Sequence, residues 1–508
     1  MKYKTLEIGI IIAMLVFTRV LPVGAASAPK LRAGAAKVNI TNVESGHQVN
    51  DSLYVKALVL NDGARSAVII TVDAVAIGGI GSVEEDYFSN VRKLIQEELN
   101  IKAGNILISA THLHGSGYMV CKDLEARTVL AVKKAWQNLV TVKISAGRGY
   151  EDRIMENRRL KLNNGKEWTI RHANPLPPVE EVVGIGPVDP DIGILRLDRK
   201  NGTTLAVVFN FTCHPYQGIP GKTTTADFPG FASKVIEENL GDRALAIFIQ
   251  GFSGDISTVL YKDVNHPRDA EVLGNMLGIS TLKALNEMPA GNGGDLNVLS
   301  EILKLPRRTD LQARIDSLKT EEAILLQSLR STSLNLKTFI PLYIKYNLSD
   351  EFPSYYSHRY MHDEMIGRDD LENQDTENRR NIIKYLKNIY AMEKLARIQE
   401  NMFFLEKFNA MNEAAGETTI DAEIQAMRIG KFVLVSFPAE VSVQVGLNIK
   451  KASPHEFTFA AGYTNGYIHY APTAEQFKGE AYEDTNCLLA PEWQAIYEKK
   501  ILEMLKKL

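Results

Sequence analysis

The residues of this chain that are best suited to chemistry stand where apolar, strand-like runs end. They are, in chain order, His112 and His114 in SATHLHGSG, His214 in VVFNFTCHPYQG, Ser253, Asp255 and Ser257 in AIFIQGFSGDIST, and Glu440 in FVLVSFPAEVSV. Imidazole and carboxylate groups are common zinc ligands, and a catalytic zinc keeps one position open for water. Side chains at the ends of sheet strands can meet although they are far apart in sequence. The set predicts a zinc site assembled from four segments.

Each of these segments also has a purely structural interpretation. A histidine at a strand end can be a structural residue, a glutamate just after a proline can cap a turn, and Gly-Asp-Ile-Ser fits a tight turn with a helix cap. Asp255 either orients a histidine or is a plain structural carboxylate. Cys213 precedes His214 and is an alternative ligand, although a free cysteine is usually a small buried hydrophobe. Only the combination of the four segments favours a metal site.

The elements that would position these residues follow from hydrophobic periodicity. Strand-like and helix-like segments alternate between residues 31 and 300, which predicts an α/β fold with a mixed sheet core and flanking helices. We expect strands at 55–60, 66–72, 106–110, 142–146, 192–197, 204–211, 244–249, 423–428, 432–437 and 457–461, and helices at 85–99, 124–139, 231–240 and 269–285. Asn201 and Gly202 predict a hairpin turn between two of the strands.

Residues 305–413 differ from the rest of the chain because apolar residues recur there at helical spacing among many charges. This pattern predicts a long helical insert in which two long helices flank a polar, aromatic-containing segment, 339–373. Helix packing accounts for the apolar residues, and a lid over the site is the alternative. His358 and His362 stand four residues apart, but no glutamate completes the HExxH pattern of a metalloprotease.

The amino-terminal sequence predicts export. Lys2 and Lys4 precede an apolar stretch at 8–17 and a small-residue end at 26–28, as in a secretory signal peptide over residues 1–28. An uncleaved anchor helix is the alternative. No later segment is apolar enough to span a membrane. We therefore expect a periplasmic or secreted protein without a transmembrane segment in its mature chain. The mature chain is expected to contain a catalytic domain at 29–304 and 414–508 and the insert at 305–413.

The overall composition argues against two classes of protein, those that bind nucleic acid and those that are built on a disulfide framework. The net charge of −3 offers no electrostatic basis for binding nucleic acid. Three cysteines in an exported chain argue against a disulfide framework. We therefore expect a small-molecule substrate, and the sequence leaves the oligomeric state open.

The motifs resemble those of the neutral/alkaline non-lysosomal ceramidase family, which are secreted zinc amidases that cleave the N-acyl bond of ceramide. SATHLHGSG is similar to the family's His-x-His-Ser/Ala-Gly segment, and FTCHPY is similar to its second zinc-histidine segment. FSGDIST is similar to the family's Gly-Asp-Val-Ser-Pro-Asn segment, and FPAEV is similar to its Phe-Pro-Gly-Glu segment. NGYIHYAPTAEQFKGEAYE is similar to the family's tyrosine-rich stretch, and ENRRLKLN is similar to its active-site arginine segment. The resemblance runs from about residue 31 to about residue 490, and the insert matches poorly.

The resemblance implies a role for eight residues. The zinc ligands would be His112, His214, Glu440 and Tyr470, and the catalytic residues would be His114, Ser257, Arg158 and Tyr482. Zinc-activated water would attack the carbonyl carbon, with His114 moving a proton and with Arg158 and Tyr482 stabilising the oxyanion. Ser257 would orient the water or act as a nucleophile.

The chain also departs from the family pattern. Thr258 and Val259 stand where the family has Pro-Asn, His114 is not followed by Pro-Gly-Gly, and we expect no C-terminal immunoglobulin-like domain. The first hypothesis is hydrolysis of an N-acyl amide in a ceramide-like lipid. The second is a glycoconjugate or another non-lipid substrate, which the charged character of the insert favours. The aromatic residues of the insert, Phe352, Tyr355, Tyr356 and Tyr360, suit sugars and an acyl chain equally well. The third hypothesis is a non-catalytic binding protein, which is disfavoured because every residue type proposed as a zinc ligand is present.

Overall fold

The structure is a computed structural model that describes residues 31–44, 46, 48–114, 120–171, 176–220, 223–241, 243–258, 269–291, 294–348, 357–479 and 481–508. The expected signal peptide lies outside the described residues. So do Phe352, Tyr355 and Tyr356 of the insert and Val259, which follows the Gly-rich turn.

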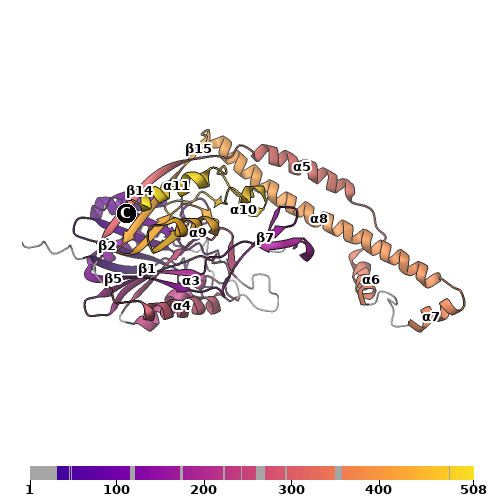
Figure 1. Cartoon of the computed structure of the whole chain (residues 1–508), viewed down its shortest axis with the longest axis horizontal. Coiled ribbons are helices and arrows are strands. Elements are labelled where there is room, and N and C mark those ends of the chain that lie inside the picture. Colours follow the sequence, from indigo (N-terminus) through magenta and orange to yellow (C-terminus); the bar gives the residue numbers. More distant parts are fainter. Residues whose placement is uncertain are drawn as a thin grey trace, which may run out of the picture.

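An eight-stranded mixed sheet forms the centre of the body (Figure 1). Its strands are, in spatial order, β12 (Leu245–Gln250), β11 (Thr204–Phe211), β10 (Asp191–Arg199), β5 (Val140–Tyr150), β1 (Arg32–Asn39), β2 (Tyr54–Asn61), β3 (Ser66–Val72) and β4 (Ile106–Ala110). The pairs β3/β4 and β11/β12 are parallel and the other pairs are antiparallel. β12 and β4 end the strand order at opposite edges, yet they contact each other because the sheet curls.

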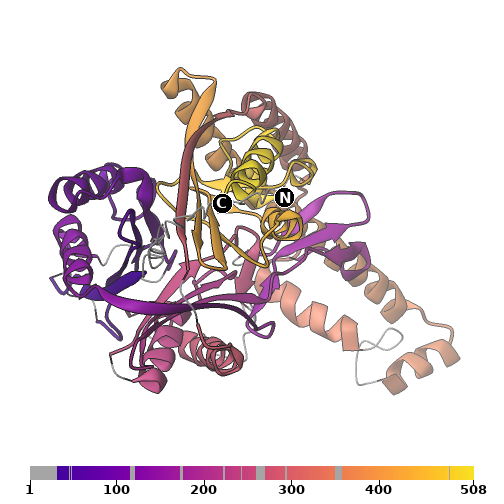
Figure 2. The same cartoon turned by 60° about the vertical axis from the view of Figure 1, so that its left-hand side comes forward.

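A second sheet packs on the inner face of the first. It contains β14 (Leu296–Pro306), β15 (Thr419–Ile429), β16 (Phe432–Ser436) and β18 (Phe457–Ala461). The helices that cover the two sheets are α1 (Tyr87–Leu99), α2 (Leu124–Gln137), α3 (Asp227–Leu240), α4 (Ala270–Glu287), α9 (Val443–Ala452) and α11 (Trp493–Leu505). α1 to α4 cover the outer face of the first sheet, and α9 and α11 cover the second. The body therefore has four layers in the order helix, sheet, sheet, helix (Figure 2).

The sequence of β2 shows why the strands read as continuous apolar runs. Val55, Ala57 and Val59 face α1 and α2, whereas Leu58 and Leu60 face the second sheet. Both faces of the strand are buried, so apolar residues occupy successive positions rather than alternate ones.

Short elements complete the body around the ends of the long strands. They are η1 (Ala103–Asn105), β6 (Met155–Asn157), β7 (Arg159–Leu162), β8 (Glu167–Thr169), η2 (Val179–Glu181), β9 (Val182–Ile185), β13 (Ile256–Thr258), β17 (Glu440–Val441), β19 (Tyr470–Ala471), η3 (Gln476–Lys478) and α10 (Tyr482–Thr485). β6 pairs with β13, β17 with β19, and β7 lies between β8 and β9.

The insert forms a helical arm that projects from the body (Figures 1 and 2). α5 (Leu311–Ser328) lies along α8 (Asp370–Ala415), and α6 (Leu336–Leu348) and α7 (Ser357–Met365) lie at the far end. At 1.5 Å per residue, the 46 residues of α8 span about 69 Å. The root of the arm is fixed to the body because Leu405 and Phe408 of α8 pack against Leu488.

The predicted α/β fold, with its mixed sheet core, flanking helices and helical insert, is confirmed. The expected polar segment at 339–373 is wrong in part, because it contains most of α6 and all of α7. α6 is held by packing of Phe339 and Tyr346 against Ile382 of α8, which local periodicity does not reveal. No helix in the described parts of the chain is long and apolar enough to cross a membrane.

Candidate functional site

Three histidines and one glutamate bring their side-chain ends together beyond the carboxyl ends of β4, β11 and β16. His112 Nε2 lies 3.0 Å from His214 Nε2 and 3.2 Å from His114 Nε2. Glu440 Oε2 lies 3.1 Å from His214 Nε2 and 3.4 Å from His112 Nε2. Neighbouring ligand atoms of a tetrahedral zinc site lie about 3.3 Å apart, since each bond is about 2.0–2.1 Å long. His112, His214 and Glu440 therefore have the spacing of a metal site, and His114 lies beside them, with the ligand atoms of the three histidines within 4.8 Å of one another.

The tautomers of two histidines follow from their second nitrogens. His112 Nδ1 lies 2.6 Å from the carbonyl oxygen of Val75, and His214 Nδ1 lies 2.7 Å from that of Ser253. A carbonyl oxygen can only accept, so in each ring Nδ1 carries the proton and donates it. In the neutral rings, both Nε2 atoms then present bare lone pairs to each other across 3.0 Å. Carbonyl groups that orient ligating histidines in this way are typical of metal sites.

Glu440 supplies the negative charge of the cluster. Its side chain is 3% exposed, and its Oε2 accepts no hydrogen bond from the residues that the structure describes. The other oxygen, Oε1, accepts a hydrogen bond from the hydroxyl of Tyr467. A buried carboxylate oxygen without a donor is costly. A cation between Oε2 and the two bare Nε2 atoms would remove both this cost and the lone-pair repulsion.

The curl of the large sheet brings the four segments together. β4 precedes His112 at one edge of the sheet, and β12 precedes the Ser253 carbonyl at the other, where the two edges are in contact. Glu440 begins β17 and pairs with Tyr470 of β19. Gly254 allows this close approach, because a Cβ atom there would lie 2.4 Å from the Glu440 carbonyl oxygen.

Left-handed backbone conformations gather at the site. His112 has φ 63°, and Tyr463, Asn465 and His469 have φ 56°, 54° and 63°. Non-glycine residues in this region carry strain of about 1–3 kcal/mol each, and such strain concentrates at functional sites. Here the strain is held by hydrogen bonds, since Asn465 accepts from the Ile108 N–H through Oδ1 and donates from its own N–H to the Ile108 carbonyl. The ring of Tyr463 stacks on His112 at 3.9 Å between centroids.

Arg158, Tyr470 and Tyr482 form one wall of the site. Arg158 Nη2 donates to the Tyr470 hydroxyl at 3.2 Å, and the Tyr482 ring lies 5.3 Å from the Tyr470 ring. Burial raises the pKa of Tyr470 well above its usual value, so the phenol is neutral in this structure. The guanidinium of Arg171 lies 3.6 Å from the centre of the Tyr482 ring.

A buried glutamate holds the position of Arg158. Glu483 Oε1 accepts from Arg158 Nε at 2.9 Å, and Glu483 Oε2 accepts from Arg159 Nη1 at 2.6 Å and from the Thr169 hydroxyl at 2.8 Å. Burial raises the pKa of Glu483, but Arg158 and Arg159 outweigh it and hold the pKa below its usual value. The arginine wall is therefore an ion-paired network that is anchored inside the protein.

Ser257, Asp255 and Cys213 lie beside the cluster in different roles. Ser257 is buried in β13, where its neighbour Ile256 accepts the His214 N–H at 3.4 Å. Asp255 accepts from the Val443 N–H at 2.8 Å and from Gln476 Nε2 at 3.0 Å. The hypothesis that Asp255 orients a histidine is wrong, and its structural alternative is correct. Cys213 is buried in an apolar cluster, as the structural alternative predicts.

Sequence reasoning missed two tyrosines of the site. Tyr467 bonds to Glu440, and Tyr463 covers His112. Tyr467 stands three residues before the predicted ligand Tyr470, and this proximity in the motif NGYIHY was the available signal. The carbonyl groups that orient the histidines carry no sequence signal, because every residue has one.

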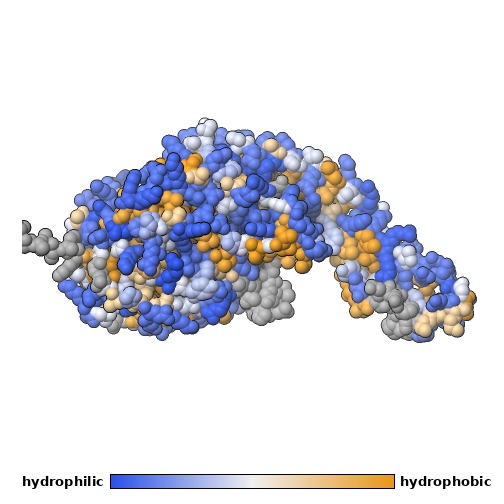
Figure 3. All heavy atoms as spheres, viewed as in Figure 1, coloured by the Kyte–Doolittle hydropathy of each residue, from blue (hydrophilic) through white to orange (hydrophobic). Residues whose placement is uncertain are grey.

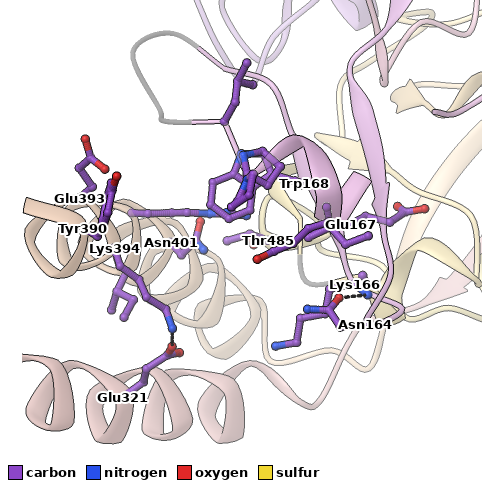
Figure 4. A pocket seen from close by; sticks show the side chains of 18 of the residues that line it. Asn164, Lys166, Glu167, Trp168, Glu321, Tyr390, Glu393, Lys394, Asn401 and Thr485 are labelled. Atoms are coloured by element: carbon purple, nitrogen blue, oxygen red, sulfur yellow. Dashed lines mark hydrogen bonds and ion pairs between the residues drawn. The ribbon is translucent and has the colours of Figure 1, made fainter. Parts of the chain in front are cut away.

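A cavity of about 1100 Å³ lies between the β7–β9 sheet and the arm. Figure 4 shows Trp168 approaching it from the sheet, and Tyr390, Lys394 and Asn401 from α8. α10 is shared with the site, because its Tyr482 packs against Tyr470 while its Thr485 lines the cavity. The root of the arm therefore contributes to the surroundings of the site.

Comparison with known proteins finds sequence similarity to one family in part of the chain. Residues 362–499 match the family model described as neutral/alkaline non-lysosomal ceramidase, N-terminal. The chain is 33% identical over 88 residues to the neutral ceramidase of Pseudomonas aeruginosa, which is 16% of this chain and 13% of that protein. It is 31% identical over 71 residues to the neutral ceramidase of Mycobacterium tuberculosis, which is 13% of this chain and 11% of that protein. The chain thus matches about an eighth of the length of these curated relatives.

Two solved structures share the fold over most of the chain. A ceramidase complexed with C2 matches with a TM-score of 0.58 and 17% identity, covering 94% of this chain and 75% of that one. The crystal structure of neutral ceramidase from Pseudomonas aeruginosa matches with the same TM-score, 15% identity and the same coverage. At these identities the likeness concerns the fold. This chain is therefore similar to neutral/alkaline non-lysosomal ceramidases in the sequence of residues 362–499 and in its fold.

Proposed function

We propose that this protein is an exported zinc-dependent amidase that hydrolyses the N-acyl bond of a ceramide-like lipid. The observation that carries the proposal is the pair of bare imidazole nitrogens at His112 and His214 facing the unpartnered Oε2 of Glu440. The donor set of two neutral imidazoles and one carboxylate is typical of catalytic zinc. The match of residues 362–499 to the family model of neutral/alkaline ceramidases supports the choice of an amide bond.

The residues present fit zinc. His112, His214 and Glu440 would hold it, and Tyr470, which neighbours Glu440 in the β17/β19 pair, would be the fourth ligand. When bound, zinc would lower the pKa of a water ligand to about 7 and polarise a carbonyl oxygen.

The other side chains of the site would carry the remaining steps. His114 is the exposed histidine of the cluster, so it can meet the substrate and carry a proton to the leaving amine. Arg158, fixed by Glu483, and Tyr482 would donate hydrogen bonds to the carbonyl oxygen as negative charge develops on it. Ser257 would orient the attacking water or act as a nucleophile.

A second candidate function keeps the zinc and replaces the lipid by a sugar-linked or other polar substrate. The lining of the 1100 Å³ cavity favours it, since Trp168 and Tyr390 provide ring faces and Asn164 and Asn401 provide amide groups (Figure 4). Amide groups can donate hydrogen bonds to the hydroxyl groups of such a ligand and accept hydrogen bonds from them, and aromatic faces can pack against its apolar faces.

The test is hydrolysis of a fluorescent short-chain ceramide by purified protein whose zinc content is known. We expect about one zinc ion per chain, release of the fatty acid, loss of activity after chelation and recovery when zinc is restored. Protein that binds zinc but does not cleave ceramide would refute the lipid substrate and favour a glycoconjugate substrate. Full activity in metal-free protein would overturn the proposal.

Replacement of Tyr467 by phenylalanine tests how Glu440 is held. The variant loses the hydroxyl that donates to Glu440 Oε1, so the carboxylate is free to rotate away from the histidines. We expect zinc affinity to fall by about 10–100-fold, as for other residues that orient metal ligands. Competition with a chromophoric chelator measures this affinity. Tyr390→Phe is the control, because Tyr390 is 62% exposed on the arm. Equal affinity in both variants would remove Tyr467 from the metal centre.

A further inference from the structure

The far end of the arm carries a helix that is apolar on two sides. α6 packs Phe339 and Tyr346 against Ile382 of α8. Its other side exposes a second set of apolar side chains, which we call the tip stripe. Its members are Leu336 (59% exposed), Ile340 (46%), Tyr343 (40%), Ile344 (54%) and Leu348 (82%). Figure 3 shows hydrophobic surface in the region of α6.

The spacing of the tip stripe shows that it is one surface. Leu336, Ile340, Ile344 and Leu348 recur every four residues, and side chains at this spacing lie above one another on a helix. Only one side of α6 is needed to pack against α8, so the stripe contributes nothing to the packing of the arm. Contiguous exposed apolar surface of this kind marks an interaction site.

The charges of α6 indicate what kind of surface it meets. α6 contains Lys337 and Lys345, both exposed, and no aspartate or glutamate, whereas the exposed acids at this end of the arm, such as Glu364, Asp370 and Glu372, belong to α7 and α8. An amphipathic helix with lysines near its apolar face binds the boundary between the headgroups and acyl chains of anionic lipids. Lysine side chains keep their charged ends at the headgroups while their methylene groups cover apolar surface.

The position of α6 also fits a lipid surface. α6 lies at the far end of the arm from the body (Figure 1). The same end exposes Met361 (57%), Met365 (85%) and Ile366 (49%), next to the end of α7. Methionine side chains adapt to an irregular apolar environment. The tip can therefore reach a bilayer while the body stays in water.

We propose that α6 is an interfacial helix that docks the arm onto an anionic lipid bilayer through the tip stripe and its two lysines. Docking does not require the proposed hydrolysis. If both hold, the arm keeps the active site at the surface where a ceramide-like substrate resides.

Co-sedimentation with vesicles of phosphatidylcholine and phosphatidylglycerol in a 7:3 ratio tests the docking. The test variant is Ile340→Gln/Ile344→Gln/Leu348→Gln. The matched control is Ile279→Gln/Ile324→Gln/Leu326→Gln, which removes three apolar side chains of similar exposure from α4 and α5. We expect the partition coefficient of the test variant to fall by about tenfold or more and that of the control to change by less than about twofold. Equal binding of the two variants, or no binding of the unaltered protein, would overturn the proposal.

A second variant and a second measurement separate the alternatives. In Lys337→Gln/Lys345→Gln, binding to the anionic vesicles should weaken, and it should lose part of its dependence on salt. Sedimentation velocity without lipid shows whether the stripe instead joins two copies of the chain. A dimer that the triple substitution dissociates would overturn the lipid assignment. Turnover of a soluble N-acyl substrate should be the same in all these proteins, so loss of docking and failure of the proposed hydrolysis give different results.

Discussion

Replacement of His112 by alanine is expected to remove the zinc and to lower kcat by about 10³-fold or more. His112 Nε2 lies within 3.4 Å of the ligand atoms of His114, His214 and Glu440, so it is the shared neighbour of the whole cluster. Without it, the proposed centre would lack a ligand and would not supply an activated water at neutral pH. Zinc content by elemental analysis and turnover of the fluorescent substrate measure the two effects.

His362→Ala is the control for this experiment. His362 is an exposed histidine on α7, far along the arm from the cluster. Its replacement should leave zinc content and kcat unchanged. Retention of zinc and of most activity in His112→Ala would show that the metal is held elsewhere and would refute the proposed centre.

Replacement of Glu483 by glutamine is expected to lower the free energy of unfolding by about 3–5 kcal/mol, because it leaves the buried Arg158 without its counter-charge, while Arg159 keeps its ion pair with Glu167. Glu483 is fully buried and bonds to both Arg158 and Arg159. Since Arg158 contacts Tyr470, we also expect a fall in kcat. Urea unfolding at pH 7 measures the stability. Glu475→Gln is the control, because Glu475 is 80% exposed and pairs with Lys478 three residues away. This control substitution should lower the free energy of unfolding by less than about 1 kcal/mol.

The effect of Glu483→Gln should also depend on pH. The pKa of Glu483 is held below its usual value, so the folded protein retains the charged form more strongly than the unfolded chain does. The resulting stability is fully present above the unfolded pKa of about 4.3 and is lost as the pH falls through the folded pKa. The stability difference between the unaltered protein and the variant should therefore shrink in acid. A difference that stays constant would mean that the ion pairs do not contribute.

The fold was predictable where the pattern is local. β2, β3 and β4 are apolar runs that are bounded by turn residues, and the Asn201-Gly202 hairpin has a sequence signal of its own. Local signals failed for α6, which contains Pro341 and has apolar residues on two sides, so no single face stands out. The helix is stabilised by packing against α8, and this contact joins segments that are more than thirty residues apart in the chain.

The sequence by itself determined the candidate ligands and the motifs that resemble those of ceramidases, because zinc chemistry restricts the residue types that can serve as ligands at strand ends. Tertiary structure alone decided that His112, His214 and Glu440 meet, since their convergence depends on the curl that brings β4 to β12. It also decided the histidine tautomers, the hydroxyl of Tyr467 on Glu440 and the structural role of Asp255. These features depend on distances between segments that are remote in the chain, and residue type and spacing carry no record of such distances.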